Sequence, residues 1–277
     1  MRYVRPSICR SRGLSIYSKD HVLELWDAVA SLPTRSTTLV ERLLEFNFRT
    51  SKAEEFATHG LARRVQLMAF NIRRVFEALP PELRDLPTDE NRQEATTHIQ
   101  SIVFHSYGCF DNLAHIWVAE RDIRRPNKSA LSLTQIGFTE KCMEVRQSLP
   151  RTLQERLVEL DPWLKFLEGF RHSSAHRIPL YIPPFVVNPL KADEYNSLSS
   201  AKTLAAQNRD WVSYDSSSQK QRRLASFRPM VATSLADPKS ALFHQQVLAD
   251  YATVEEWSNT ILAELVRADG VDSPLAL

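Results

Sequence analysis

The chain has 277 residues, of which 43% are hydrophobic and only 6 are glycine, and 35 lysines and arginines nearly balance 33 acidic residues. This length can bury a substantial core, and the composition excludes collagen-like, disordered and disulfide-framework proteins. The near-neutral charge by itself gives no indication of a nucleic-acid partner. We therefore expect an α-rich globular protein.

The N-terminal end is basic, with four arginines and no acid in residues 1–18. We interpret it as a basic arm, followed by a single helical domain over residues 19–268 and a tail over 269–277. No segment approaches the roughly 18 apolar residues of a membrane helix, and the arm lacks the apolar run of a secretory signal. Cys9, Cys109 and Cys142 lack metal-ligand spacing and indicate reduced thiols. A soluble, cytoplasmic protein without a membrane partner is expected.

Apolar residues recur at helical spacing along most of the chain and predict its helices in order. Ser18 is expected to cap the first helix, over residues 19–31, because Pro33 follows its end. Further helices are expected over residues 51–79, 91–121, 134–148, 191–208 and 239–268, and one more begins near residue 153. In the longest, the stripe that faces the core is Ile99, Ile102, Ser106, Cys109, Leu113 and Ile116. This pattern predicts an all-α, up-and-down helical bundle.

The helical pattern breaks between residues 186 and 238. Besides the helix over 191–208, we expect a short strand over 227–233 and a polar loop that holds the serines at 216–218. The basic residues of this loop are Lys220, Arg222, Arg223 and Arg228. No P-loop, GxGxxG, HExxH or GxSxG motif occurs in the chain, which argues against nucleotide hydrolases, Rossmann enzymes and serine hydrolases. The insertion is therefore predicted to be partly irregular.

The most informative segment lies at the end of the helix that begins near residue 153. It sets Arg171, His172 and His176 beside an abrupt helix end, because Pro179 and the prolines after it disfavour continuation. On an ideal helix Arg171 and His176 lie about 140° apart, whereas His172 and His176 lie about 40° apart. Arginine and histidine can therefore converge only if the arginine stem wraps around or the helix distorts.

A second set of polar residues repeats every four positions on the longest predicted helix. Tyr107, Asp111 and His115 form one stripe, and Asn112 lies beside it. Packed together, the two helices would bring a carboxylate, a guanidinium and several imidazoles into one groove. A guanidinium can hold a phosphate, and an imidazole can take or give a proton at neutral pH, which suits RNA cleavage without a metal.

The spacing Arg171-x4-His176, with the polar His172 in second position, resembles the R-x(4–6)-H motif of the HEPN superfamily. The upstream Asp111 and Asn112 are similar to the acidic or amide position on an earlier helix of that superfamily. The segment over residues 178–184 also looks like a subgroup of bacterial HEPN-like proteins. The resemblance covers residues 60–265.

This resemblance implies a metal-independent endoribonuclease that needs no cofactor. His176 would act on the 2′-hydroxyl or the leaving group, while Arg171 would hold the scissile phosphate. Asp111 would orient Arg171, and His172 would be an auxiliary polar residue. The surrounding binding residues would be Tyr107, Asn112, His115 and Arg177. The resemblance further implies a homodimer with two motifs side by side, a toxin or antiphage-defence role, and an antitoxin or other regulatory partner.

Three other interpretations of the same residues stay open. In the first, Arg171, His172 and His176 only stabilise the C-terminus of their helix, because the helix dipole favours positive charge there. In the second, the protein binds RNA or nucleotides, or assembles, without cleavage, as some HEPN-like proteins do. Alternatively, the i,i+4 pairs on the two helices, with Asp111 and His115 as one pair, could hold a divalent metal in a helical-bundle hydrolase.

Overall fold

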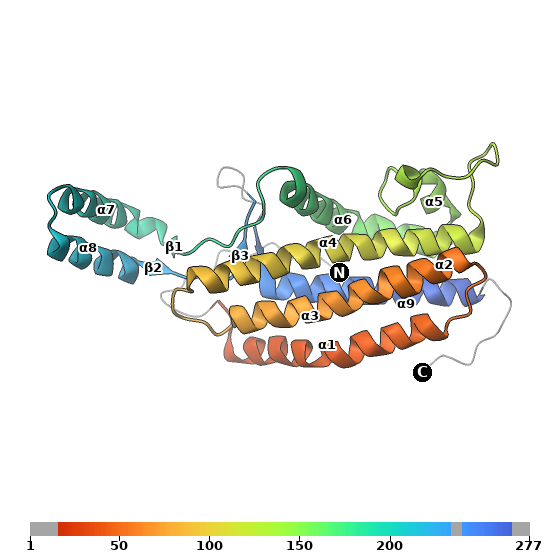
Figure 1. Ribbon diagram of the computed structural model, residues 1–277, viewed down its shortest axis with the longest axis horizontal. Coiled ribbons are helices and arrows are strands. Elements are labelled where there is room, and N and C mark those ends of the chain that lie inside the picture. The colour runs from red at the N-terminus through yellow and green to blue at the C-terminus, as the bar shows by residue number, and fades with distance from the viewer. Residues whose placement is uncertain (1–15, 234–239, 268–277) are drawn as a thin grey trace.

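Long helices lie side by side along the molecule, as Figure 1 shows. They are α1 (Lys19–Glu45), α3 (Ala62–Ala78), α4 (Asp89–Arg121), α6 (Arg151–His176) and α9 (Phe243–Arg267). The computed structural model describes residues 16–233 and 240–267. The basic arm up to residue 15, Cys9 and the predicted tail over 269–277 lie outside the described residues. The predicted all-α bundle is confirmed.

The core lies between these helices and is dominated by large apolar side chains. The bulkiest fully buried residues include Trp257, Tyr251, Phe76 and Phe170. Cys109 and Cys142 are buried free thiols. Within the two described stretches, no helix combines the length and the apolar character that crossing a bilayer requires.

Helix α1 runs straight through Pro33, so its predicted end was wrong. Ser18 does cap the helix, because its side chain accepts a hydrogen bond from the His21 amide at 3.1 Å. Beyond the proline, Leu39 and Leu43 are buried in the core. A proline inside a helix costs about 3 kcal/mol. Burying each leucine contributes about 1.5 to 3 kcal/mol, so tertiary packing outweighs the local penalty.

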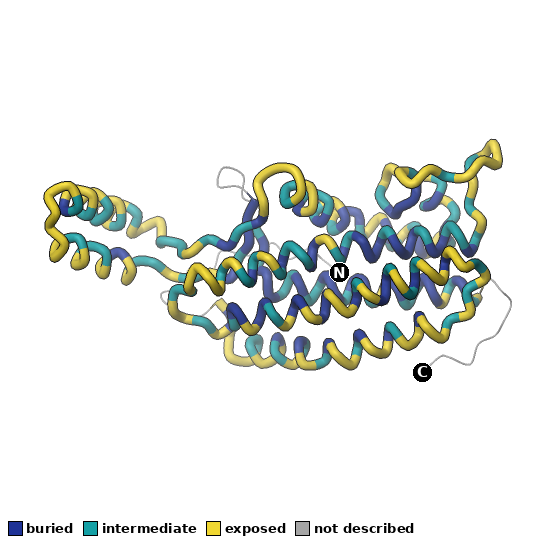
Figure 2. The backbone as a smooth tube through the Cα atoms, in the orientation of Figure 1, coloured by how far each residue is buried: buried dark blue, intermediate teal, exposed yellow. Residues whose placement is uncertain are grey.

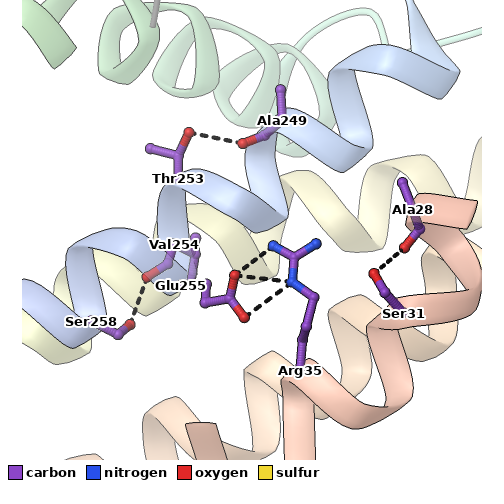
Figure 3. Close-up of polar contacts among 8 residues, drawn as sticks. All are labelled: Ala28, Ser31, Arg35, Ala249, Thr253, Val254, Glu255 and Ser258. Carbon is purple, nitrogen blue, oxygen red and sulfur yellow. Dashed lines mark hydrogen bonds and ion pairs between the residues drawn. The ribbon is translucent and has the colours of Figure 1, made fainter. Parts of the chain in front are cut away.

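An ion pair fastens α1 to α9 in the lower half of the bundle. The Arg35 Nε donates to the Glu255 Oε2 at 3.1 Å (Figure 3), and the guanidinium carbon lies 5.1 Å from the centre of the Tyr251 ring. Ser31 donates to the Ala28 carbonyl within α1 at 2.7 Å. Charged and hydroxyl groups at this helix contact are thus satisfied within the protein.

The predicted helix over residues 51–79 is confirmed, but it is not uniform. It comprises α2 (Ser51–Glu55), the π-helical segment η1 (Phe56–Leu61) and α3, and it begins at a Thr50 side chain that accepts from the Ala53 amide at 3.1 Å. A π-helical turn widens the backbone and is found often at functional sites. This one faces α4.

The long helix α4 and the motif helix α6 are confirmed. The predicted core stripe of α4 is buried along its whole length, and α6 packs against α4 and ends at His176. The motif therefore lies at a helix terminus, as expected. The proline at 162 lies inside α6.

The predicted helix over residues 134–148 is wrong. Only η2 (Leu133–Gln135) and α5 (Met143–Ser148) are helical, with turns between them. Ile136 and Phe138 are both buried in this turn region. Two residues two positions apart point to opposite sides of a helix, so a helix could not have buried both in the same core.

The insertion is more regular than predicted. It holds β1 (Val186–Val187), η3 (Pro189–Lys191), α7 (Ala192–Gln207), α8 (Trp211–Leu224), β2 (Ala225–Ser226) and β3 (Met230–Val231). The helix over 191–208 is confirmed, and the expected strand over 227–233 is present only as β3. The polar loop at 216–218 was wrong, because these serines lie inside α8, which the Asp210 carboxylate caps by accepting from the Ser213 amide at 3.1 Å.

Two short antiparallel pairings tie the insertion together. Strand β1 pairs with β2, and β3 pairs with β4 (Ala241–Leu242). Helices α7 and α8 form a hairpin that projects beyond the end of the bundle in Figure 1 and is exposed along most of its surface in Figure 2. We call this hairpin, residues 192–224, the α7–α8 arm.

Candidate active site at the end of α6

The predicted motif forms the last turns of α6 and is open to solvent. Arg171, His172 and His176 are exposed, as is Arg177, whose backbone amide donates to the Ser173 carbonyl at 3.0 Å. The rings of His172 and His176 lie edge to face with 5.2 Å between their centres. The structure therefore brings the two imidazoles together, as their four-residue spacing predicted.

Helix α4 supplies the surface on which Arg171 rests. The guanidinium carbon of Arg171 lies 4.5 Å from the centre of the Tyr107 ring of α4, in a cation–π contact. Burial, together with the charges of Asp111 and Glu168, raises the pKa of the Tyr107 phenol to about 12, and the charge of Arg171 opposes this rise. The tyrosine is therefore a neutral, flat support for the arginine.

Asp111 lies one turn beyond Tyr107 on α4. Burial raises the pKa of its carboxyl to about 6, and the positive charges of Arg171 and Arg64 counteract that rise. We expected Arg171 to donate a hydrogen bond to Asp111. Among the described residues the two side chains share no hydrogen bond or ion pair, because the guanidinium lies on the Tyr107 ring instead. Their interaction is electrostatic and indirect.

Arg64 of α3 is the main site residue that the sequence did not reveal. Its Nε donates to the Asn112 Oδ1 at 2.9 Å, and its Nη1 lies 3.4 Å from the His105 Nδ1. A Cβ atom at Gly108 would lie only 2.5 Å from the Arg64 guanidinium carbon. Glycine at 108 therefore makes the space in which Arg64 crosses α4 toward Asp111.

The π-helical segment η1 holds the other side of this polar network. A Cβ atom at Gly60 would lie 2.7 Å from the Asn112 Nδ2, so Asn112 packs directly against the backbone of η1. Asn112 is consequently buried. Glycine inside a helix costs about 1 kcal/mol relative to alanine, so Gly60 and Gly108 within predicted helices were the available sequence signal for close approaches here.

His115 is separated from the rest of the predicted polar stripe. Its ring stacks on Phe56 with 4.2 Å between ring centres and 4° between the planes. Its Nδ1 is buried without a hydrogen-bond partner, and burial, followed by the charge of Lys52, lowers its pKa. It lines a cavity of about 230 Å³ beside Lys52 and Arg124. His115 therefore borders this cavity and makes no contact with the motif.

The arrangement required for a metal-dependent hydrolase is not assembled. Over residues 16–233 and 240–267, no three histidine, cysteine, aspartate or glutamate side chains gather as metal ligands. The imidazoles of His172 and His176 face each other in solvent, whereas His115 stacks on Phe56. The two i,i+4 pairs thus do not form a joint ligand set.

No protein-family model, curated protein or solved structure matches the chain. The chemistry of the site therefore has to follow from its own side chains. The region carries an exposed guanidinium, two neighbouring imidazoles and a carboxyl group whose pKa is about 6. Groups of these kinds can bind a phosphate and move protons near neutral pH.

Proposed function

We propose that this protein is an endoribonuclease that cleaves RNA without a metal ion, with its active site where the end of α6 meets α4. One observation carries the proposal: Arg171 lies over the Tyr107 ring while His172 and His176 face each other in the same exposed turns. A phosphodiester bound there would meet a cation and two imidazoles. Membership of the HEPN superfamily is part of the proposal and rests on the Arg171-x4-His176 spacing.

In the proposed reaction, the 2′-oxygen attacks the adjacent phosphorus, a 2′,3′-cyclic phosphate forms and the bond to the 5′-oxygen breaks. His176 takes the proton of the 2′-hydroxyl, and protonated His172 returns a proton to the leaving 5′-oxygen. Arg171 donates hydrogen bonds to the non-bridging oxygens, whose negative charge grows during the attack. The protons balance, and no oxidant, reductant or metal is consumed.

The residues around Arg171 position its guanidinium through charge and through contact with an aromatic ring. Asp111 attracts the guanidinium toward α4 through its charge, and Tyr107 supports its flat face. Arg64, held by its hydrogen bond to Asn112, acts on Asp111 through its charge. These are positioning residues, and Arg177 is a further cation at the helix end that can bind a neighbouring phosphate.

The exposure of the motif favours a shared active site. With Arg171, His172 and His176 open to water, the reacting phosphate would be stabilised weakly, because charge interactions are strongest where water is excluded. A two-fold homodimer with the two motifs facing each other would supply that cover. Light scattering combined with cleavage rates across a dilution series tests this; an active monomer would exclude a shared site. A toxin or defence role, with an antitoxin or other regulatory partner, remains part of the proposal on the resemblance alone.

The decisive experiment is RNA cleavage by the purified full chain in the presence of EDTA. We expect products that end in 2′,3′-cyclic phosphate or 3′-phosphate at an unchanged rate, and no cleavage by a His176→Ala variant. Matched controls are His21→Ala on α1 and Arg151→Ala at the far end of α6, which should cleave as the wild type does. RNA binding without cleavage would leave the non-catalytic RNA-binding alternative, and a rate abolished by EDTA would favour the metal enzyme.

A further inference from the structure

The α7–α8 arm is held together by polar contacts and not by a core. Gln221 is buried between the helices, where its Nε2 donates to the Tyr195 carbonyl at 3.2 Å and its Oε1 accepts from the Lys202 Nζ at 3.3 Å. Of the two helices, only Ala205 and Gln221 are buried. Nearly all of the arm surface therefore remains available for contact with another molecule.

The base of the arm carries cations that the protein does not neutralise. Lys220, Arg222 and Arg223 on α8, with Arg228 just beyond β2, form no ion pair among the described residues. The acidic Asp193 and Glu194 lie at the same end on α7, and they leave an excess of positive charge there. Elsewhere in the protein, by contrast, several arginines are paired with acids, as Arg146 is with Asp161 at 2.7 Å. Unpaired cations on a projecting element create a field that attracts a polyanion.

The far end of the arm presents aromatic rings beside cations. Trp211 is the first residue of α8 and is 60% exposed. Its ring lies 6.0 Å from that of Tyr214, centre to centre, and the Lys202 Nζ lies 5.3 Å above the Tyr214 ring. Exposed aromatic faces next to positive charge are the surfaces on which unpaired nucleobases stack.

The distribution of these groups favours nucleic acid over a protein partner. Exposed apolar side chains occur near the two ends of the arm, at Leu190 and around Trp211, and they do not form a continuous stripe. The surface of α8 between the ends is built mostly from serine, glutamine and basic residues, with one acid, Asp215. A stable helix–helix interface needs an apolar centre, whereas hydroxyl, amide and basic side chains are the usual donors to phosphate.

We propose that the α7–α8 arm binds single-stranded RNA, with bases stacked on Trp211 and the phosphate backbone held by the cations at the base of the arm. Helix α8 has 14 residues and is thus about 21 Å long, so both features can contact one strand. The arm follows α6 in the chain after residues 177–191, so a strand held on the arm would be bound to the same subunit that carries the motif. The choice of RNA over DNA rests on the proposed ribonuclease function.

The stacking half of the proposal is tested by fluorescence anisotropy with a labelled oligouridylate of about 16 nucleotides. The full chain carries His176→Ala to prevent cleavage. We expect Trp211→Ala to weaken binding at least about fivefold, since stacking one base contributes about 1 to 3 kcal/mol. Trp211→Phe should retain most of the affinity, and Val212→Ser, at an 82% exposed neighbouring position, should bind as the parent does. Circular dichroism shows whether the arm keeps its helices.

The cation half is tested by the salt dependence of the same binding. Replacing Lys220, Arg222, Arg223 and Arg228 with glutamine should lower the slope of log affinity against log salt by about 0.7 for each phosphate that the protein no longer neutralises. The control replaces with glutamine four exposed cations outside the arm that also form no ion pair among the described residues, Lys19, Arg73, Arg84 and Lys128. Both variants lower the net charge from +2 by four, to −2, so only the position of the cations differs.

Parental affinity in both the Trp211→Ala variant and the arm-cation variant would overturn the proposal. An equal loss of RNA affinity in the control variant, or tighter binding to an RNA duplex than to a single strand, would also overturn it. So would light scattering that shows the arm variants dissociating from a dimer while their RNA affinity is unchanged. Binding and cleavage are read separately. An arm that binds RNA in a protein that never cleaves it would sustain this inference and remove the ribonuclease.

Discussion

Asp111 is flanked by two arginines that are held in opposite ways. Arg64 of α3 acts on it through its charge, occupies the space left by Gly108 and is fixed by a 2.9 Å hydrogen bond to the buried Asn112. Arg171 approaches from α6, lies on the Tyr107 ring and keeps its guanidinium exposed to solvent. One guanidinium is part of the packing, and the other is free to meet a ligand.

This difference indicates that Arg64 has a structural role and Arg171 a role in activity. A group that is bonded on one side and packed on the other has little freedom to bind a phosphate, so Arg64 should matter mainly to stability. An exposed arginine with a flat support loses little stability when removed, so Arg171 should matter mainly to activity. The two flanks of Asp111 can therefore be told apart by which property each substitution changes.

The largest effect is expected for Arg171→Ala. If Arg171 holds the charge that develops on the phosphate, cleavage should fall by about 100- to 1,000-fold. The free energy of unfolding should stay within about 0.5 kcal/mol of wild type, because the side chain is exposed. Single-turnover cleavage and urea unfolding measure the two quantities. A large loss of stability with unchanged cleavage would instead assign Arg171 to capping the end of α6.

The reverse is expected for Arg64→Ala. Removing its side chain leaves the buried Asn112 Oδ1 without a donor, which should destabilise the protein by about 2 kcal/mol. The matched control is Arg63→Ala on the same helix, where the exposed side chain hydrogen-bonds to His59 and its loss should cost under about 0.5 kcal/mol. Equal unfolding free energies for the two variants would show that Arg64 is not part of the packing.

Asp111→Asn should stabilise the protein at neutral pH, by about 1 kcal/mol. The folded-state pKa of Asp111 is raised to about 6, so the folded protein favours the protonated form, and stability declines as pH rises from about 4 through 6. The benefit of the amide should therefore be largest above pH 6 and vanish near pH 4. In the control, Asp122→Asn, the change in unfolding free energy should have the opposite sign, because the hydrogen bond from Arg124 lowers the pKa of Asp122. Urea unfolding at several pH values measures both; a benefit of Asp111→Asn that does not change with pH would contradict a burial-raised pKa.

The smallest effect, but a diagnostic one, is expected for Gly108→Ala. The added methyl group must displace the Arg64 guanidinium, and that loss should roughly cancel the gain of about 1 kcal/mol in helix propensity. In an Arg64→Ala background nothing remains to be displaced, so the same substitution should become clearly stabilising. A double-mutant cycle measures this coupling, and additive changes would mean that Gly108 and Arg64 are independent.

The local pattern of the sequence was sufficient for most helices and for the position of the motif. Periodic apolar residues located the helix over 91–121, and the prolines after Arg177 indicated where α6 ends. These features depend on neighbours within one or two turns. The spacing of His172 and His176 likewise predicted the contact between their rings, because both residues lie on one helix.

The tertiary structure alone decided which side chains meet between helices. It also decided where a helix continues through residues that disfavour helix locally. Pro33 is tolerated because distant helices bury the leucines on both sides of it, and the serines of α8 are helical because a cap and a neighbouring helix hold them. The approach of Arg64 to Asp111 joins residues on two helices, and the separation of His115 from them depends on Phe56. Helical periodicity is a property of one segment, whereas the side on which each polar residue finds its partner depends on how the segments pack together.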